Sequence, residues 1–113
     1  MWMFTTEGFY SVVQKLGDPH LTVRTRWAGD LDTLRTKWLP TLGPTESSPN
    51  NDYPFRAIVG HAEFAIALTR MAMALDYSNF KSAVGVRQGR QRAHIYGDVW
   101  SDCLQIETDG EAA

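Results

Sequence analysis

The sequence contains a single cysteine, Cys103, among its 113 residues. One cysteine excludes an intrachain disulfide, and such sparing use is typical of proteins that fold in a reducing compartment. The beginning of the sequence lacks a basic segment followed by a long apolar run, so no signal peptide is expected. The longest mainly apolar run, residues 62–75, includes Glu63 and Arg70 and is too short to span a bilayer. These absences predict a cytoplasmic protein with no membrane partner.

Common motifs for catalysis and cofactor binding are also absent from the sequence. Residues 84–90 are rich in glycine but lack the Lys-Ser/Thr ending of a phosphate-binding loop. The histidines lack the spacing of a metal site, and the His94–Asp98 spacing is more typical of a surface hydrogen bond. Cys103 falls on the inward stripe of a predicted helix, where a packed thiol is expected. We therefore predict no cofactor, no metal and no catalytic residue, with a small enzyme built from dispersed residues as an alternative.

Charge of either sign is not in large excess, because the formal net charge is −2. This balance argues against bulk binding to nucleic acid. The charges are nevertheless unevenly placed, since residues 98–113 hold five acidic residues and no Lys or Arg, and residues 81–94 hold four basic residues and no acid. The four basic residues are Lys81, Arg87, Arg90 and Arg92. This basic segment is either a solvated helix face or a binding patch for an anionic partner.

Aromatic residues are plentiful, with four Trp, four Tyr and five Phe, and they suffice for a core without disulfides or metals. Apolar alternation and turn residues predict strands over residues 2–5, 9–15, 21–27 and 53–59. Helical spacing predicts helices over residues 30–39 and 61–75, a short helix that ends at Val84, and a last helix over residues 87–104. Asp30 is the expected N-cap of the first helix. The residues expected to face inward on the last helix are Tyr96, Val99, Trp100, Cys103 and Leu104.

The order of these elements, β-β-β-α-β-α-α, predicts an α+β fold. We expect a two-layer sandwich, in which an antiparallel β-meander plus one further strand is covered on one face by helices. Residues 40–54 contain four of the five prolines and are predicted to form a loop with little regular structure. Residues 1–106 are expected to form a single domain, and residues 107–113 a frayed acidic tail.

Three arginines are candidates for binding. Arg24 and Arg26 point to the same side of one predicted strand, and Arg56 points away from the apolar side of another. If helices cover only one face of the sheet, all three share the other face, where their guanidinium groups suit carboxylate or phosphate recognition. The alternative is that they pair with acidic residues on neighbouring strands.

Two similar segments combine an aspartate, a tyrosine and an apolar ring. Asp52 and Tyr53 precede Phe55 and Arg56, and Asp76 and Tyr77 precede Phe80 and Lys81. One interpretation is structural, with the aspartates capping turns and the tyrosine rings packed. The other makes both segments walls of a shared polar pocket.

Several motifs, taken as a set, resemble those of a family of small uncharacterised bacterial and phage proteins. They are W-M-F-T, G-F-Y-S-V-V, V-R-T-R, D-Y-P-F-R, D-Y-S-N-F-K and R-A-H-I-Y-G-D-V-W. The resemblance covers residues 2–100 and implies a compact α+β domain without an activity that can be carried over. The association with phages implies an inhibitor of a host system, antiviral defence included.

The sequence therefore favours a small non-enzymatic interaction module that binds a protein or an anionic partner. One version is a phage-type inhibitor whose acidic residues from Asp98 onward compete with phosphates for a basic groove of a host complex. The alternatives are a weak single-stranded nucleic-acid binder that uses Arg24, Arg26 and Arg56, and a small enzyme with a dispersed site.

Overall fold

A computed structural model describes residues 1–107 of the chain. The chain divides into two compact units, Met1–Asp76 and Tyr77–Ala113, and each is described by itself. The elements of the first unit are β1 (Trp2–Phe4), β2 (Phe9–Val13), β3 (Leu21–Thr25), α1 (Ala28–Lys37), β4 (Glu46–Ser47), β5 (Phe55–Val59) and α2 (His61–Met73). The second unit contains α3 (Phe80–Gln88) and α4 (Arg90–Cys103).

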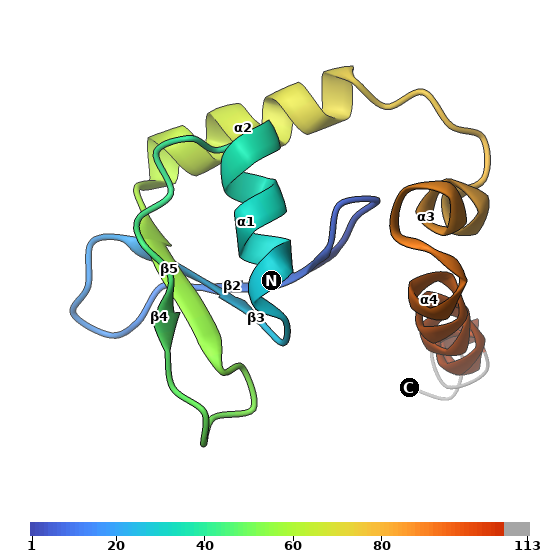
Figure 1. Ribbon diagram of the computed structural model, residues 1–113, viewed down its shortest axis with the longest axis horizontal. Helices are drawn as coiled ribbons and strands as arrows, with labels where there is room; N and C mark the ends of the chain where they lie inside the picture. The colour runs from blue at the N-terminus through green and yellow to red at the C-terminus, as the bar shows by residue number, and fades with distance from the viewer. Residues whose placement is uncertain (108–113) are drawn as a thin grey trace. The chain divides into compact units, whose positions relative to one another are not determined.

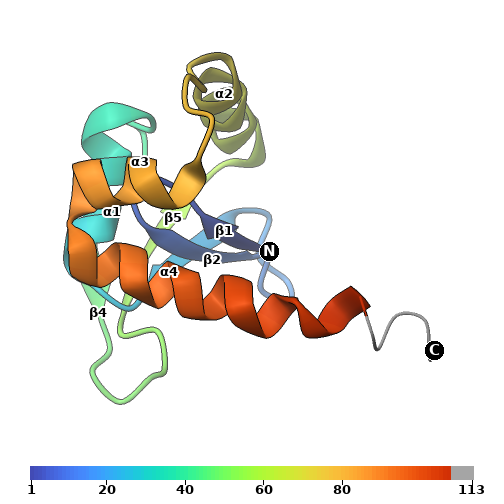
Figure 2. The same cartoon turned by 90° about the vertical axis from the view of Figure 1, so that its right-hand side faces the viewer.

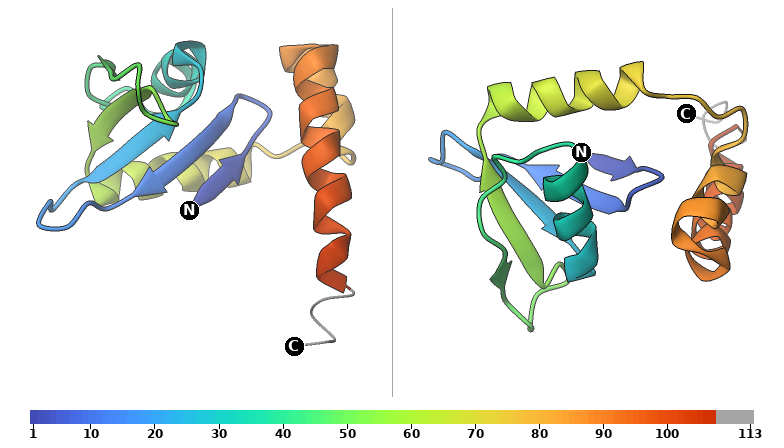
Figure 3. Two further views of the ribbon diagram at one scale, coloured as in Figure 1. Left: turned by 90° about the horizontal axis from the view of Figure 1, so that it is seen from below. Right: turned by 45° about the horizontal axis from the view of Figure 1, so that its top comes forward.

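The first unit is built on an antiparallel five-stranded sheet with the strand order β1-β2-β3-β5-β4 (Figures 1 and 3). Alternating residues fix which side of each strand meets the core. In β2 and β3, Tyr10, Val12 and Val23 are buried, as are Ala57 and Val59 in β5. The predicted meander and further strand are therefore confirmed, and each strand is shorter than its predicted range.

Helices α1 and α2 supply the second layer of the first unit. Leu31 and Leu34 of α1, with Phe64 and Ala67 of α2, form one hydrophobic cluster with the buried strand residues. Because all these strand residues lie on one side of the pleat, both helices cover the same face of the sheet. The predicted α+β sandwich, with helices on one face of an antiparallel sheet, is confirmed.

Asp30 is not the N-cap of α1, and that prediction was wrong. The helix begins at Ala28, and Asp30 lies in its first turn with 3% of its surface exposed. Its Oδ2 atom accepts a hydrogen bond of 3.0 Å from the backbone N–H of Phe9, and the Tyr10 hydroxyl donates to its carbonyl oxygen at 2.8 Å. The carboxylate therefore holds the turn between β1 and β2 onto α1 instead of capping its own helix.

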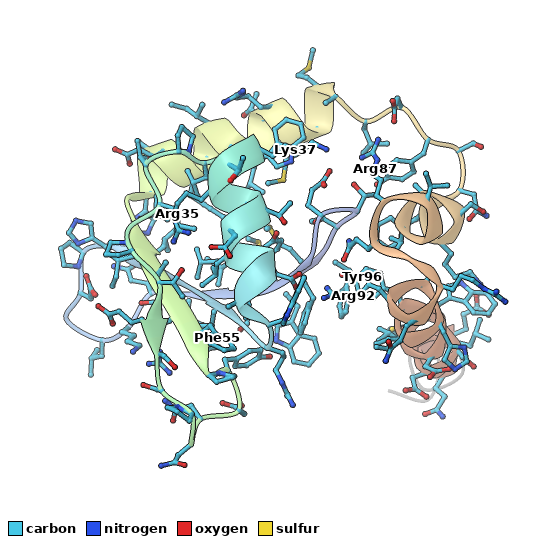
Figure 4. All side chains as sticks on the ribbon, viewed as in Figure 1. Arg35, Lys37, Phe55, Arg87, Arg92 and Tyr96 are labelled. Carbon is cyan, nitrogen blue, oxygen red and sulfur yellow. The ribbon has the colours of Figure 1, made fainter. Side chains whose placement is uncertain are left out.

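The proline-rich loop over residues 40–54 is more ordered than its composition suggests. Arg35 of α1 donates to the carbonyl oxygens of Leu42 at 3.3 Å and Gly43 at 2.6 Å, and to the Thr45 hydroxyl at 3.0 Å (Figure 4). The loop also contains β4, which pairs with β5 at the edge of the sheet. A single guanidinium group thus ties the first part of this loop to the helix.

The second unit is a pair of helices that lie side by side (Figure 2). Asn79 caps α3, since its side-chain oxygen accepts a hydrogen bond of 2.9 Å from the backbone N–H of Ser82. The helix continues past the predicted end at Val84 to Gln88. Gly89, with a φ angle of 97° that favours glycine, separates it from α4, which begins at Arg90 and not at residue 87.

The inward face predicted for the last helix is only partly right. Tyr96 is buried, but Trp100, Cys103 and Leu104 are exposed. Helical spacing identified an apolar stripe correctly. Helix α3 is short, and its Phe80 covers the first residue of that stripe, Tyr96. The single domain expected over residues 1–106 stays a prediction, and the predicted tail, apart from Glu107, lies outside the described residues.

Candidate functional site

The sheet face opposite α1 and α2 carries the predicted arginines, and we call it the arginine face. It is defined by the residues that alternate with the core residues, namely Trp2, Phe4, Phe9, Ser11, Arg24 and Arg56. Arg24 of β3 lies directly opposite Arg56 of β5, and Ser11 lies opposite Arg24 on the other side. Sequence alternation predicted the shared face, and the strand register makes the two arginines direct neighbours.

Arg24 is held in place by two contacts. Its Nη2 atom donates to the Ser11 hydroxyl at 2.6 Å, and its Cζ atom lies 4.7 Å from the centre of the Tyr53 ring. The second distance is that of a cation–π contact, which orients the plane of the guanidinium group. Its Nε atom is buried without a hydrogen-bond partner.

Arg56 is held more loosely than Arg24. Its Nη2 atom donates to the carbonyl oxygen of Tyr53 over 3.4 Å, and its Nε atom is also buried without a partner. Glu46 lies opposite Arg56 in the register, yet no ion pair within residues 1–107 includes Arg24, Arg26 or Arg56. The predicted alternative, in which these arginines pair with acidic residues on neighbouring strands, therefore does not hold within the described chain.

An aromatic group borders the two arginines, and the sequence analysis did not identify it. The Phe4 and Phe9 rings are stacked with centroids 4.4 Å apart, and Trp2 meets both edge-on at 6.5 and 5.9 Å. Tyr53, near the end of the proline-rich loop, contacts Arg24, and its ring centroid lies 6.4 Å from that of Phe9. Trp2 keeps 67% of its surface exposed. The signal for this group is strand register. Trp2 pairs with Ser11 and Ser11 pairs with Arg24, so the rings of the first hairpin lie on the same face as the arginines.

Arg26 is the outlying member of the predicted group. Strand β3 ends at Thr25, so Arg26 lies one residue beyond the paired segment and is exposed. It is therefore at the margin of the arginine face instead of in the row that joins Ser11, Arg24 and Arg56.

The two Asp-Tyr segments belong to different units. Asp52 accepts a hydrogen bond of 3.1 Å from the backbone N–H of Tyr53, whose side chain is buried. Asp76 is exposed and ends the first unit, while Tyr77 begins the second and lies 5.9 Å from Phe80. Tyr53 thus joins the arginine face through its contact with Arg24, and the shared pocket stays a prediction.

The basic segment over residues 81–92 divides between the faces of α3 and α4. Lys81 and Arg90 line one surface groove together with a histidine that the sequence analysis did not place there. The lining residues of this groove are Lys81, Ser82, Gly85, Arg90, Gln91, Ala93 and His94. Arg87 and Arg92 are not among them, so the groove takes up two of the four predicted basic residues.

Features that would indicate other kinds of site are few in the described chain. No group of three or more His, Cys, Asp or Glu residues that could hold a metal ion occurs within residues 1–107. None of the helices over the same residues is long and apolar enough to cross a membrane. Cys103 is exposed, so the expected packed thiol was wrong. The pKa of Asp18 is lowered, chiefly because its carboxylate accepts a hydrogen bond from the backbone N–H of His20, in the turn between β2 and β3.

Comparison with known proteins adds no functional information. No protein-family model, curated protein or solved structure matched this chain. The resemblance to small bacterial and phage proteins therefore stays a prediction.

Proposed function

We propose that this chain is a small interaction module whose arginine face binds an acidic segment of a protein partner. The observation that carries the proposal is the pairing of Arg24 with Arg56 across two strands without a carboxylate partner in the described chain. Like charges placed directly opposite each other on a sheet are destabilising, by about 0.2–1 kcal/mol. A protein that keeps such a pair gains from it when an anion binds between them.

The hydrogen-bonding capacity of the two guanidinium groups supports this proposal. Each arginine carries five N–H donors, and each uses one Nη2 atom in a hydrogen bond within the protein. The Nε atoms are buried, so the donors that remain for a carboxylate are those on the Nη atoms, which can form two parallel hydrogen bonds with it. The Tyr53 contact already fixes Arg24, so less side-chain entropy is lost when it binds.

The composition of the face favours a protein partner over nucleic acid. Trp, Tyr and Arg are the residues that most often dominate the binding energy of protein interfaces, and Trp2, Tyr53, Arg24 and Arg56 lie together. Single-strand binders instead need a positively charged groove along several nucleotides. This chain has a net charge of −2, and Glu46 lies at the edge of the same row.

A single-stranded nucleic-acid binder is the second candidate, because the exposed Trp2 ring offers a base-stacking surface beside two cations. The cytoplasmic location, the phage-type inhibitor version and the small enzyme stay predictions.

A binding experiment with two probes tests the proposal. One probe is a labelled peptide in which Asp and Glu alternate with Leu and Phe, and the other is a labelled single-stranded oligonucleotide, both followed by fluorescence anisotropy at low salt. We expect the acidic peptide to bind and the double variant Arg24→Gln/Arg56→Gln to lose at least about tenfold in affinity, as two charge-assisted contacts are removed. Arg70→Gln, on α2, is the matched control and keeps the affinity.

Three results count against the proposal. Binding of the oligonucleotide alone, with a steep loss of affinity as salt rises, assigns the face to nucleic acid instead. Absence of binding by either probe to the folded protein contradicts an anion-binding face. Equal affinity of the double variant and the wild type places the peptide elsewhere. The circular dichroism spectrum of each variant verifies that it is folded.

A further inference from the structure

The groove between α3 and α4 concentrates positive charge on a concave surface of the second unit. Its volume is about 640 Å³, within the range of small-molecule sites. Three of its lining side chains, Lys81, Arg90 and His94, are cationic or become so on protonation, and none is acidic. The groove is formed by residues of the second unit, whereas the arginine face is formed by residues of the first.

The shape of the groove follows from small residues and from the turn at Gly89. Phe80 and Tyr96 stack with centroids 5.7 Å apart and an interplanar angle of 7°, which holds α3 against α4. Gly85 has no side chain, and a Cβ atom built there would meet the Ala93 Cβ atom at 3.8 Å. The two helices therefore approach each other closely at small residues, Gly85 and Ala93, which line the groove together with the polar side chains.

Lys81 and Arg90, two of the basic side chains of the groove, are not neutralised by acidic residues of the described chain. No ion pair of Lys81 or Arg90 occurs within residues 1–107. The Lys81 ammonium lies 4.8 Å from the centre of the Trp100 ring, a cation–π contact that positions it and leaves its charge in place. His94 has an exposed carboxylate neighbour, Asp98, at 3.8 Å.

We propose that this groove binds a small phosphate-bearing molecule, with at least two negative charges on the phosphate groups. A lone carboxylate needs one guanidinium fork, whereas a dianionic or polyanionic phosphate is matched by more than one cation. Arg90 supplies a planar fork, Lys81 a compact point charge, and Ser82 and Gln91 supply neutral donors on the same surface. The volume exceeds that of a phosphate group alone, so the rest of the ligand has room beside it.

Titration of the full chain with pyrophosphate, followed by backbone amide chemical shifts, tests the proposal. We expect saturable shifts at residues 80–94 that persist when Arg24→Gln/Arg56→Gln removes the other candidate anion site. The double variant Lys81→Gln/Arg90→Gln is expected to weaken binding at least about tenfold. The reason is that a charge-assisted contact contributes more binding free energy than a neutral hydrogen bond does. Arg87→Gln removes the same charge from α3 at a position outside the groove and is expected to keep the affinity within about twofold.

A second variant, Ser82→Leu, keeps the charge and fills one wall of the groove. Because Ser82 is exposed, the fold is expected to survive, and binding of pyrophosphate is expected to fall with no change of net charge. Equal shifts in wild type and Lys81→Gln/Arg90→Gln overturn the proposal, as does the absence of shifts in the wild type at low salt.

The identity of the phosphate source is resolved by parallel titrations. A nucleoside triphosphate that binds more tightly than pyrophosphate, with further shifts around Trp100, assigns the site to a nucleotide, and equal affinity assigns it to the phosphate groups alone. Binding of a single-stranded oligonucleotide without binding of either small molecule overturns the proposal. The variant Arg24→Gln/Arg56→Gln is expected to bind pyrophosphate as the wild type does.

Discussion

The two faces of the sheet are made from alternating residues of the same strands, yet one is packed with apolar side chains and the other carries two opposed charges. Tyr10 has no exposed surface and faces the helices, and Ser11, its neighbour in β2, faces Arg24. On the core face, apolar side chains pack against α1 and α2, and the buried hydroxyls of Tyr10 and Thr25 are both hydrogen-bonded. On the arginine face, two like charges lie directly opposite each other and two Nε atoms are buried without partners.

This contrast indicates that the core face stabilises the fold and that the arginine face is the candidate for binding. Burial of apolar surface and satisfied hydrogen bonds stabilise the core face. The arginine face has features that lower stability, and proteins keep such features mainly where a ligand or partner uses them. Substitutions on the core face are therefore expected to change mainly the free energy of unfolding, and substitutions of the two arginines mainly the affinity for the acidic peptide.

Truncation of the core is expected to have the largest effect on stability. Leu34 has no exposed surface and packs onto the core face, so Leu34→Ala is expected to lower the free energy of unfolding by about 2–5 kcal/mol. Ile58→Ala is the matched truncation on the opposite face, where the side chain is 38% exposed, and is expected to cost less than about 1 kcal/mol. Urea denaturation measures both values, and a similar loss in the two variants would contradict the difference between the faces.

Loss of one buried hydroxyl is expected to have the next largest effect. Tyr10→Phe removes the hydrogen bond to the Asp30 carbonyl oxygen and keeps the ring, so the free energy of unfolding should fall by about 1 kcal/mol. Binding of the acidic peptide to the arginine face is expected to stay within twofold, because the Tyr10 side chain lies on the other side of the sheet. Weaker binding at unchanged stability would mean that the two faces are not independent.

Much of this contrast could be predicted from alternation alone. Leu21, Val23 and Thr25 alternate with Thr22 and Arg24, so the side on which each arginine lies follows from the need to bury the apolar set. The direct opposition of Arg24 and Arg56 could not be predicted, because it depends on the register between strands separated by α1 and the proline-rich loop. The role of Asp30 was missed for a similar reason, since its partner Phe9 lies on a distant segment.

The groove in the second unit shows the same limit. Lys81 and Arg90 were candidates from charge alone, but the packing of α3 on α4 decides which basic residues share a surface. Arg87 ends up in α3 and does not line the groove, and a prediction that began α4 at residue 87 could not make that distinction. Local propensity predicts where the helices lie, whereas the packing of α3 on α4 determines which basic residues line the groove.

The smallest expected effect gives the sharpest test of the arginine face. Arg56→Thr removes one of two opposed charges and a weak hydrogen bond of 3.4 Å, and it introduces a β-branched residue that suits a strand. The free energy of unfolding is therefore expected to rise by a few tenths of a kcal/mol, up to about 1 kcal/mol, while binding of the acidic peptide weakens.

Salt dependence distinguishes this explanation from a simple gain in strand propensity. If relief of charge repulsion stabilises the variant, the gain over wild type is largest at low ionic strength and shrinks as added salt screens the pair. Arg24→Thr serves as the comparison, because it also loses the 2.6 Å hydrogen bond to Ser11 and the contact with Tyr53, and is expected to be destabilised. Should Arg56→Thr instead cost more than about 1 kcal/mol, Arg56 is a structural residue, and the opposed arginines no longer argue for a binding partner.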